Sequence, residues 1–368
     1  MKKISIILFI IVLLLQGCAL KKAEDKAIHI AVMLEDEEER YVLGVNKAIS
    51  DVQEEYKDYD IKCTFYKDFG NYDIGAGIID EILSDNTITA ILSSKNMDIT
   101  KMAAHEFEKN KKLMIARYSL YDEVLADNSY KHVFSLCYSA EGIGKAARSV
   151  ANFQNVKKWA VCYADDEFSR QEVRNFTSTL EDSVQIMDIV KENLLLQRFD
   201  SVLAKWQSLD IEGVAVFLYD ITGIDLVKKI KEANPELCII GDFEIDNDDY
   251  MTAISNWEVV FEGLNLLEQF HADIKDEEWD RLSKISGTED HIDTNTIHGY
   301  NAVRMVVDTA VKNNTVSPTE IAKKLHEDGY MGISQEFAFT DNGRLKQKTY
   351  GFSTLKDGNW IQYSVDSN

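Results

Sequence analysis

Proline and cysteine are scarce in this chain of 368 residues, which has 2 prolines, 18 glycines and 5 cysteines. So few cysteines, scattered along the chain, do not make a disulfide scaffold. With little proline and glycine, the loops must be short or built from Asn, Asp and Ser. Basic residues are also in deficit, at 40 against 63 acidic residues, which gives a net charge of −23. A chain so acidic repels phosphate backbones, which argues against a nucleic-acid partner.

Long hydrophobic runs are absent apart from one near the start, so the sequence is not that of a multi-span membrane protein. Hydrophobic residues nevertheless make up 45% of the chain, an ordinary share for a globular protein. This composition excludes disorder over most of the length. At roughly 100–200 residues per domain, the length indicates two domains.

The single long apolar run, over residues 4–15, follows Lys2 and Lys3. A basic start and about a dozen apolar residues are typical of a secretory signal, and the run is too short for a comfortable permanent span. The run ends in Leu15-Gln16-Gly17-Cys18, which resembles a bacterial lipobox, although Gln16 replaces the usual small residue. The alternative is an ordinary signal peptide that a cysteine happens to follow.

The lipobox resemblance implies a signal peptide over residues 1–17 and a lipid on Cys18. Residues 18–26 are then a short lipidated tether, and the folded body is exported. The body lies at the outer face of the cell membrane or in the periplasm. The lipid on Cys18 anchors it there, because two or three acyl chains hold a protein stably on a membrane. This location argues against an intracellular enzyme supplied with ATP or NAD.

The remaining cysteines are predicted to be buried thiols, because each lies in a strand-like apolar run. They are Cys63, Cys137, Cys162 and Cys238. None forms a CxxC pair and no histidine cluster accompanies them, so no zinc or other metal site is predicted.

From residue 27 onwards, short strand-like runs alternate with helical stripes. The first block has strand-like runs at 28–34, 61–66, 87–92 and 112–116, with helical stripes at 40–56, 74–83 and 97–107. A second block of similar length starts at 133–136 and ends near 240. This alternation predicts βαβ units and parallel sheets. The last hundred residues contain helical stripes at 279–285 and 300–311 and a third helix that starts near Pro318 and ends near His326. Asp-Asn-Gly and Asp-Gly turns follow them and predict closing antiparallel strands.

The order of these segments resembles the type I periplasmic binding proteins, and among them the branched-chain amino-acid binding proteins of ABC importers. Residues 90–94 resemble that family's strand and serine pair at the ligand, and 159–168 its strand with a Tyr/Asp loop. Residues 298–303 resemble a helix usually written Tyr-Asp-Ala, and 339–343 a Phe-Asp-Asn-Gly turn. The likeness covers nearly all of 27–363, and the order and spacing of the motifs carry it.

The sequence departs from the family pattern at three places. An acidic loop, Glu35-Asp36-Glu37-Glu38-Glu39, stands where the family is usually rich in glycine. Asn301 replaces a usual aspartate, and Ser169 replaces a usual glycine. The ligand can therefore differ from the family's common amino acids.

The resemblance implies an α/β fold of two Rossmann-like lobes with parallel sheets and three crossovers between the lobes. Lobe 1 is expected to contain residues 27–135 and 265–334. Lobe 2 is expected to contain residues 136–264 and 335–368.

Ligands of open parallel sheets bind beyond the carboxyl ends of the strands. The candidate ligand-binding residues at those ends are Ser93, Ser94, Tyr118, Ser119, Tyr163, Phe168, Tyr219, Asp242 and Glu244. By resemblance, the serine pair and Ser119 hold an α-carboxylate, and the aromatic side chains of the second block cover the ligand. Asp242 or Glu244 would face an ammonium group.

Each of these candidates has a plainer reading. Ser94 could only cap the helix that follows it, and the tyrosines could pack between the lobes. Asp242 and Glu244 could be solvated loop acids. The acidic loop 35–39 is interpreted as a solvated charge run rather than a cation site.

Residues 142–147 match G-x-G-x-x-A, and Asp165 follows at the spacing of a dinucleotide site. The preceding strand ends near Cys137, however, so the first glycine is not tight against it. No G-x-S-x-G elbow occurs and the seven histidines mark no constellation. No catalytic residue and no cofactor are therefore predicted.

Three functions remain open. The first is a lipoprotein that binds a small polar solute, an amino acid or an analogue, and delivers it to an ABC permease. The second is a lipoprotein that senses a ligand for a membrane receptor without transport, and the third is an exported enzyme on the same fold. In the first two, a ligand bound between the lobes would close them about a hinge.

Overall fold

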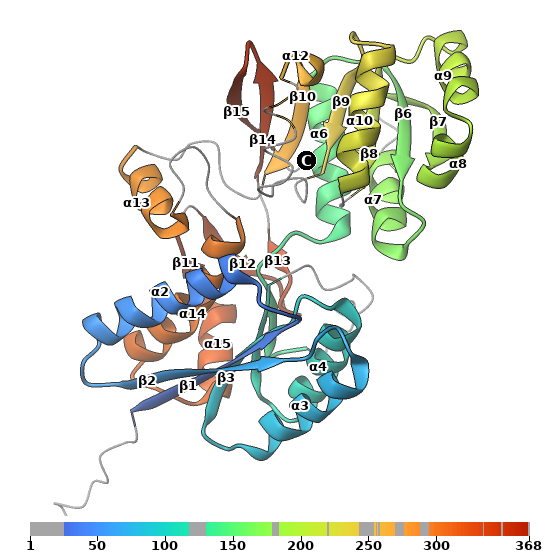
Figure 1. Ribbon diagram of the computed structural model, residues 1–368. Coiled ribbons are helices and arrows are strands. Elements are labelled where there is room, and N and C mark those ends of the chain that lie inside the picture. The colour runs from blue at the N-terminus through green and yellow to red at the C-terminus, as the bar shows by residue number, and fades with distance from the viewer. Residues whose placement is uncertain are drawn as a thin grey trace, which may run out of the picture.

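The computed structural model describes eleven parts of the chain: residues 26–117, 130–178, 184–218, 221–242, 254, 256, 258–268, 276–287, 294–333, 335–346 and 349–366. They form two lobes, one above the other in Figure 1, each built on its own sheet. Cys18 and the predicted signal peptide lie outside the described residues.

The first lobe contains a five-stranded sheet in which every pairing is parallel. In spatial order its strands are β2 (Asp60–Lys67), β1 (Ala27–Leu34), β3 (Ile88–Leu92), β4 (Leu113–Ala116) and β5 (Val133–Ser135). The connecting helices are α2 (Glu39–Glu55), α3 (Tyr72–Ser84) and α4 (Met97–Lys109), and three helices from late in the chain join them: α13 (Asp276–Ser286), α14 (Thr294–Lys312) and α15 (Pro318–Asp328).

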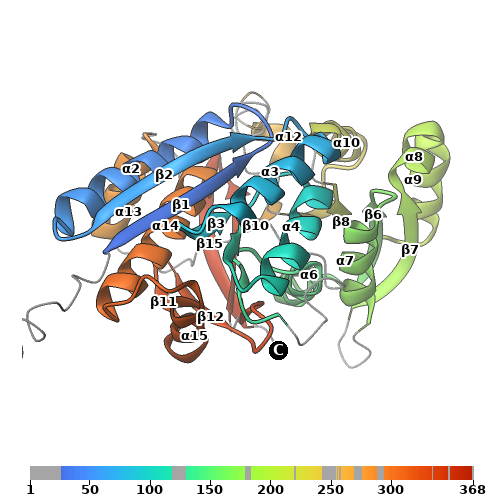
Figure 2. The same ribbon diagram turned by 90° about the horizontal axis from the view of Figure 1, so that it is seen from below.

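The apolar runs of this sheet follow from burial on both faces. In β1, Ile28, Ile30 and Val32 pack in one core with α2 and α14, whereas Ala31 and Met33 pack in another with α3 and α4. Figures 1 and 2 show the two helix layers on opposite sides of the strands. Side chains alternate between the faces of a strand, so a strand buried on both faces carries apolar residues at successive positions, as β1 does except at His29.

The second lobe contains a seven-stranded sheet. Its parallel strands are β7 (Gln185–Lys191), β6 (Lys158–Tyr163), β8 (Gly213–Phe217), β9 (Cys238–Gly241) and β10 (Leu264–Glu268). Two antiparallel strands, β14 (Thr349–Lys356) and β15 (Asn359–Asp366), extend it, as the Asp-Gly turn predicts. Its helices are α6 (Ala140–Phe153), α7 (Glu167–Thr177), α8 (Glu192–Gln197), α9 (Phe199–Ser208), α10 (Ile221–Ala233) and α12 (Glu258–Phe261).

The chain passes between the lobes three times. It crosses between β5 and α6, again after β10, and finally just before β14. A small sheet of β11 (Tyr330–Met331), β12 (Glu336–Phe339) and β13 (Leu345–Lys346) precedes the last crossing. Phe337 and Phe339 of β12 pack in the core of the first lobe, whereas β10 pairs with β9 of the second. Sheet and core membership therefore places the second and third crossings after residues 268 and 346, one strand or more later than the predicted bounds of 265 and 335.

Helices α2 and α14 lie in direct backbone contact. A Cβ atom on Gly44 would overlap the carbonyl oxygen of Thr296, and one on Gly299 would lie 2.5 Å from the carbonyl oxygen of Tyr41. Both positions therefore require glycine for this approach.

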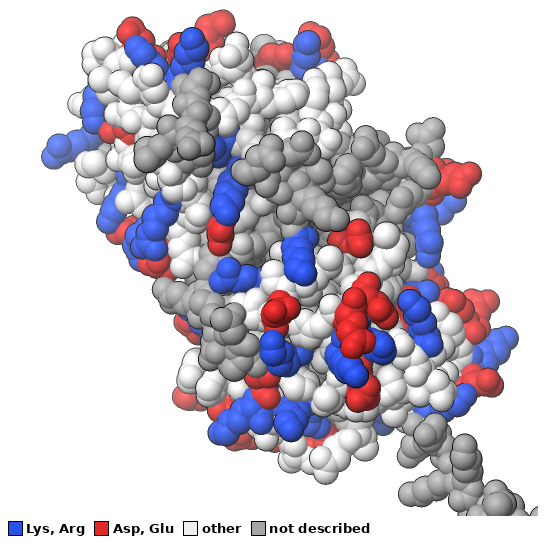
Figure 3. Space-filling model, turned by 180° about the vertical axis from the view of Figure 1, so that it is seen from behind, with Lys and Arg blue, Asp and Glu red and all other residues white. Residues whose placement is uncertain are grey.

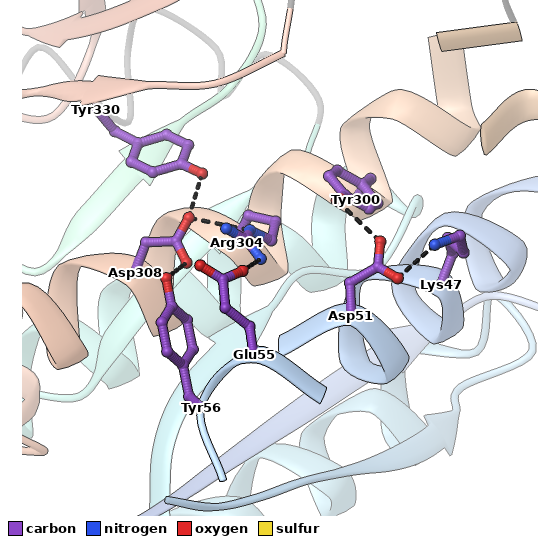
Figure 4. A network of polar contacts seen from close by, with 8 residues as sticks. All are labelled: Lys47, Asp51, Glu55, Tyr56, Tyr300, Arg304, Asp308 and Tyr330. Atoms are coloured by element: carbon purple, nitrogen blue, oxygen red, sulfur yellow. Dashed lines mark hydrogen bonds and ion pairs between the residues drawn. The ribbon is translucent and has the colours of Figure 1, made fainter. Parts of the chain in front are cut away.

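A network of polar side chains joins the outer parts of the same two helices (Figure 4). Asp308 accepts hydrogen bonds from Tyr56 at 3.0 Å, from Tyr330 at 2.9 Å and from Arg304 Nε at 3.0 Å. Arg304 also donates to Glu55 at 2.7 Å. Burial raises the pKa of the Asp308 carboxyl, against the opposing effect of Arg304.

The four described cysteines are free thiols. Cys137 and Cys162 are buried, as predicted, whereas Cys63 and Cys238 are half-buried. Within the described ranges no group of His, Cys, Asp and Glu could hold a metal ion, and no helix is long and apolar enough to cross a membrane. On the face shown in Figure 3, acidic and basic side chains are interspersed.

Candidate functional site

Polar side chains gather at the carboxyl edge of the first sheet. Because the strands are parallel, the residues that follow them meet at one edge. These residues are Glu38 after β1, Asp68 after β2, Ser93 and Ser94 after β3, Arg117 after β4 and Cys137 after β5. The edge is next to the second lobe, because β5 ends at Ser135 and α6 of that lobe begins at Ala140.

Arg117 is the central charge of this edge. Its side chain is 3% exposed and pairs with the carboxylate of Glu38, which is 10% exposed. The guanidinium also lies 4.1 Å from the centre of the Tyr41 ring, a cation–π contact. A buried charge is tolerated only with such compensation, so Glu38 and Tyr41 explain how arginine can stand here.

Ser93 and Ser94 are both buried. The Arg117 backbone N–H donates to Ser93 Oγ at 3.2 Å, and Ser93 Oγ donates to the Ser94 carbonyl at 3.2 Å. Ser94 does not cap the helix directly, because α4 begins at Met97 and Asn96 Oδ1 accepts the Ile99 N–H at 3.1 Å. The alternative that Ser94 only caps this helix is therefore wrong, because Asn96 is the capping residue. Ser93 instead joins the ends of β3 and β4, and Ser94 Oγ accepts the Asn96 N–H at 3.1 Å.

Asp68 is fully buried at the end of β2. Its Oδ1 accepts the Gly70 N–H at 2.9 Å, and within the described part of the chain its Oδ2 has no hydrogen-bond partner. Burial raises the pKa of Asp68, and the Ser94 hydroxyl and the Gly70 amide oppose that rise. A buried oxygen without a partner is suited to accept a proton or a hydrogen bond from a bound molecule.

His298 of α14 is a buried member of this cluster, beside Cys137 and Arg117. Its Nδ1 lies 3.9 Å from Cys137 Sγ, which donates to the Arg117 carbonyl at 2.6 Å. Burial, together with the charge of Arg117, lowers the pKa of His298 to about 3. The imidazole is therefore neutral at physiological pH, and Arg117 is the cation of the cluster.

The candidates from the second block are less concentrated. Tyr163 ends β6 half-buried, and Asp242 is buried directly after β9. Phe168 is 8% exposed and packs in a core with α6, which suits packing as well as contact with a ligand. Tyr118, Ser119, Tyr219 and Glu244 lie outside the described residues.

Asp165, which matches the acid of a dinucleotide fingerprint, is exposed. It pairs with Lys191 at 2.8 Å and with Arg170 at 2.9 Å. It therefore lies in a surface ion-pair group of the second lobe rather than in a phosphate site.

The sequence interpretation missed Glu38, Asp68, Arg117 and His298. Arg117 carried a usable signal, because this charged residue directly follows an apolar strand. The signal of Asp68 was weaker, because Lys67 stands between it and the aromatic pair Phe65-Tyr66. Glu38 carried no such signal, because the sequence does not distinguish it from the acids on either side. His298 appeared in the sequence analysis only as the first residue of the helix motif 298–303.

Comparisons with known proteins identify the family and the fold of the chain. The model of the periplasmic binding protein family matches residues 35–359. The chain belongs to that family. No curated protein sequence matches it.

Solved structures of the same fold cover most of the chain at low identity. An ABC transporter substrate-binding protein from Desulfitobacterium hafniense, in complex with Leu, has a TM-score of 0.77 at 18% identity, covering 92% of this chain and 100% of that one. A branched-chain amino acid transporter substrate-binding protein from Streptococcus pneumoniae, in complex with isoleucine, has a TM-score of 0.74 at 13% identity, covering 92% and 99%. A solute-binding protein from R. palustris, in complex with benzoate, has a TM-score of 0.74 at 12% identity, covering 92% and 96%.

Membership of the periplasmic binding protein family implies an extracytoplasmic location and a role in binding solutes rather than in catalysis. The polar edge of the first lobe fits that role. Its groups can hold a charged molecule, and the neutral His298 is buried beside Arg117.

Proposed function

We propose that this protein is an extracytoplasmic lipoprotein that binds a small solute with a carboxylate, an amino acid or a close analogue, between its lobes and delivers it to an ABC importer. The observation that carries the proposal is the buried Arg117 at the carboxyl edge of the first sheet, beside the second lobe. A guanidinium recognises carboxylates with directed, charge-assisted hydrogen bonds.

The rest of the proposed site comes from both lobes. Asp68 supplies a carboxylate for an ammonium group, and its buried oxygen supports that role. Asp242 at the end of β9 is the second-lobe acid in a position to do the same, and Tyr163 would cover the apolar part of the solute. Ser119, Tyr118, Tyr219 and Glu244 remain proposed contacts on the strength of the sequence alone.

The proposed mechanism is closure of the lobes over the solute. A solute that contacts both lobes makes more contacts in the closed state and shifts the population towards it. The permease would then recognise the closed form. The lipid on Cys18 would keep the protein near the permease, so that each loaded molecule needs only a short search.

The proposal is tested by identifying what the protein carries. The chain is purified from its membrane without added solute, denatured, and the released molecules are identified by mass spectrometry. Calorimetry then measures the affinity for the identified compound and for a panel of leucine, isoleucine and benzoate. We expect the released molecule to be a carboxylate. Release of a sugar, or no binding of any carboxylate, would contradict the proposal.

Transport is tested separately, by uptake of the labelled solute in cells with and without the gene. Uptake that depends on the protein supports delivery to an importer. Binding with unchanged uptake would favour the alternative, a sensor that presents its ligand to a membrane receptor.

A further inference from the structure

Glu38 differs from the other acids of its loop in where its side chain points. Asp36, Glu37 and Glu39 are exposed, whereas the Glu38 carboxylate is 10% exposed and pairs with Arg117. Its Oε1 also accepts the Glu35 backbone N–H at 2.6 Å. Asp36, Glu37 and Glu39 are therefore solvated and Glu35 is half-buried, whereas the Glu38 carboxylate reaches the central charge of the site.

Glu38 holds this position in a backbone conformation that glutamate rarely adopts. It precedes α2 with φ 41° and ψ 51°, in the left-handed region, and its side chain does not cap the helix. Left-handed backbone costs about 1 kcal/mol for such a residue, so other contacts must hold it there. Here the side-chain contacts are those with Arg117 and with the Glu35 amide.

We propose that Glu38 is an internal competitor: its carboxylate holds the place on Arg117 that the carboxylate of the bound solute takes, and binding exchanges one for the other. This inference rests on the proposed function, because it assigns the solute's carboxylate to Arg117. It makes Glu38 a specificity-determining residue that acts through Arg117.

The exchange follows from the charges of the site. Arg117 is buried, so it requires an anion whether or not a solute is present. Glu38 is the carboxylate paired with it and stands beside exposed loop residues, so it has a short way to solvent. A solute with a carboxylate can replace it, whereas a neutral or purely cationic analogue cannot. The exchange therefore selects carboxylates. It also weakens their apparent affinity for the protein, because part of the binding free energy is used to release Glu38 from Arg117.

The test compares Glu38→Gln with Glu37→Gln, which removes one negative charge from the same loop. Glu37 is the matched control because its carboxylate is 74% exposed and pairs with Lys67 at 2.5 Å. The probes are acetate, L-leucine, and L-leucinol, which keeps the ammonium group and lacks the carboxylate. Calorimetry and thermal unfolding of the purified full-length chain in detergent give the dissociation constants at pH 7.

Glu38→Gln should bind acetate at least about tenfold more tightly than the wild type, the smaller end of what a charged hydrogen bond contributes. It should bind L-leucine more tightly by a similar factor, whereas its affinity for L-leucinol should not improve and Glu37→Gln should match the wild type. Equal or weaker acetate binding by Glu38→Gln would overturn the proposal. So would an equal gain in Glu37→Gln, because the effect would then be one of loop charge.

A measurement on the wild type keeps the proposal testable if Glu38→Gln folds poorly. Saturating acetate should speed hydrogen exchange at the Glu35 amide, because that amide loses the Glu38 carboxylate as its acceptor. Unchanged or slower exchange there would contradict the release of Glu38.

Failure of the exchange and failure of the proposed function give different results. If no amino acid binds the wild type but acetate follows the expected pattern, the exchange stands and the solute class is wrong. If amino acids bind the wild type and Glu38→Gln binds them no better, the function stands and the exchange is wrong.

Discussion

Replacing Gly44 by alanine should destabilise the first lobe, even though alanine favours helices. Gly44 lies inside α2, where a Cβ would overlap the Thr296 carbonyl oxygen and lie 3.0 Å from the Tyr300 backbone nitrogen. These obstacles are backbone atoms, so α2 and α14 must move apart to admit a methyl group. Overpacking of this kind costs about 1–3 kcal/mol, and backbone obstacles place Gly44→Ala near the upper end.

The gain in helix propensity offsets part of this cost. Alanine in place of glycine stabilises a helix interior by about 1 kcal/mol. The net effect of Gly44→Ala is therefore a loss of about 2 kcal/mol in the free energy of unfolding. Gly77 provides the matched control, because it lies inside α3 and a Cβ there would meet nothing within 4 Å. Gly77→Ala should stabilise the protein by about 1 kcal/mol.

Urea unfolding followed by far-ultraviolet circular dichroism measures both changes. Hydrogen exchange locates them, and in Gly44→Ala the faster exchange should appear in α2 and α14. If Gly44→Ala is as stable as Gly77→Ala, the helices do not approach as closely as the structure shows, and the reasoning is refuted.

Three further predictions concern the site and the anchor. Burial raises the pKa of Asp68 above its usual 3.8, so its ionisation lowers the stability of the folded state as the pH rises through that range. The unfolding free energy of Asp68→Asn should therefore improve relative to the wild type between pH 4 and pH 7, and a constant difference in urea titrations would contradict this. Replacing both Ser93 and Ser94 by alanine leaves the Arg117 N–H without its acceptor, which should cost about 1–3 kcal/mol in stability. It should also weaken carboxylate binding in calorimetry, and unchanged stability and affinity would refute the assignment of the serines. Cys18→Ala should move the protein out of the membrane fraction or leave an unprocessed precursor, whereas an unmodified Cys18 in membrane-bound wild type, seen by mass spectrometry, would argue against lipidation.

The strands and helices of the first lobe were predictable because their burial requires apolar residues in a regular pattern, which the sequence shows. The run at 28–34 and the stripe at 40–56 became β1 at Ala27–Leu34 and α2 at Glu39–Glu55, within one residue at each end. The crossings were not predictable to the same degree. Nothing local to residues 264–268 shows that they pair with β9, because strand pairing depends on residues far away in the sequence.

The site residues also differ in how far the sequence alone could predict them. Ser93 and Ser94 follow a buried strand, and the rule that ligands bind at strand ends found them. Arg117 stands in an equivalent place, but whether an arginine after a strand is buried depends on its partner. That partner, Glu38, belongs to the loop that was interpreted as a solvated charge run. The interpretation holds for the exposed Asp36, Glu37 and Glu39 and is wrong for Glu38, because only the folded chain brings that carboxylate to Arg117.

Charge balance gives the proposed closure its driving force. Closing the second lobe over the edge of the first encloses the solute with Arg117 and Asp68, and enclosed charges lose more by desolvation than they gain unless they are paired. A zwitterionic solute takes the place of Glu38 on Arg117 and supplies a cation for Asp68 at the same time, so loading favours the closed state. A simple carboxylate supplies only the anion for Arg117, so Asp68 would have no cation. Asp68 would then take up a proton, and its raised pKa favours that protonation. A solute without a charged group would leave the Arg117–Glu38 pair intact and would not shift the population towards the closed state.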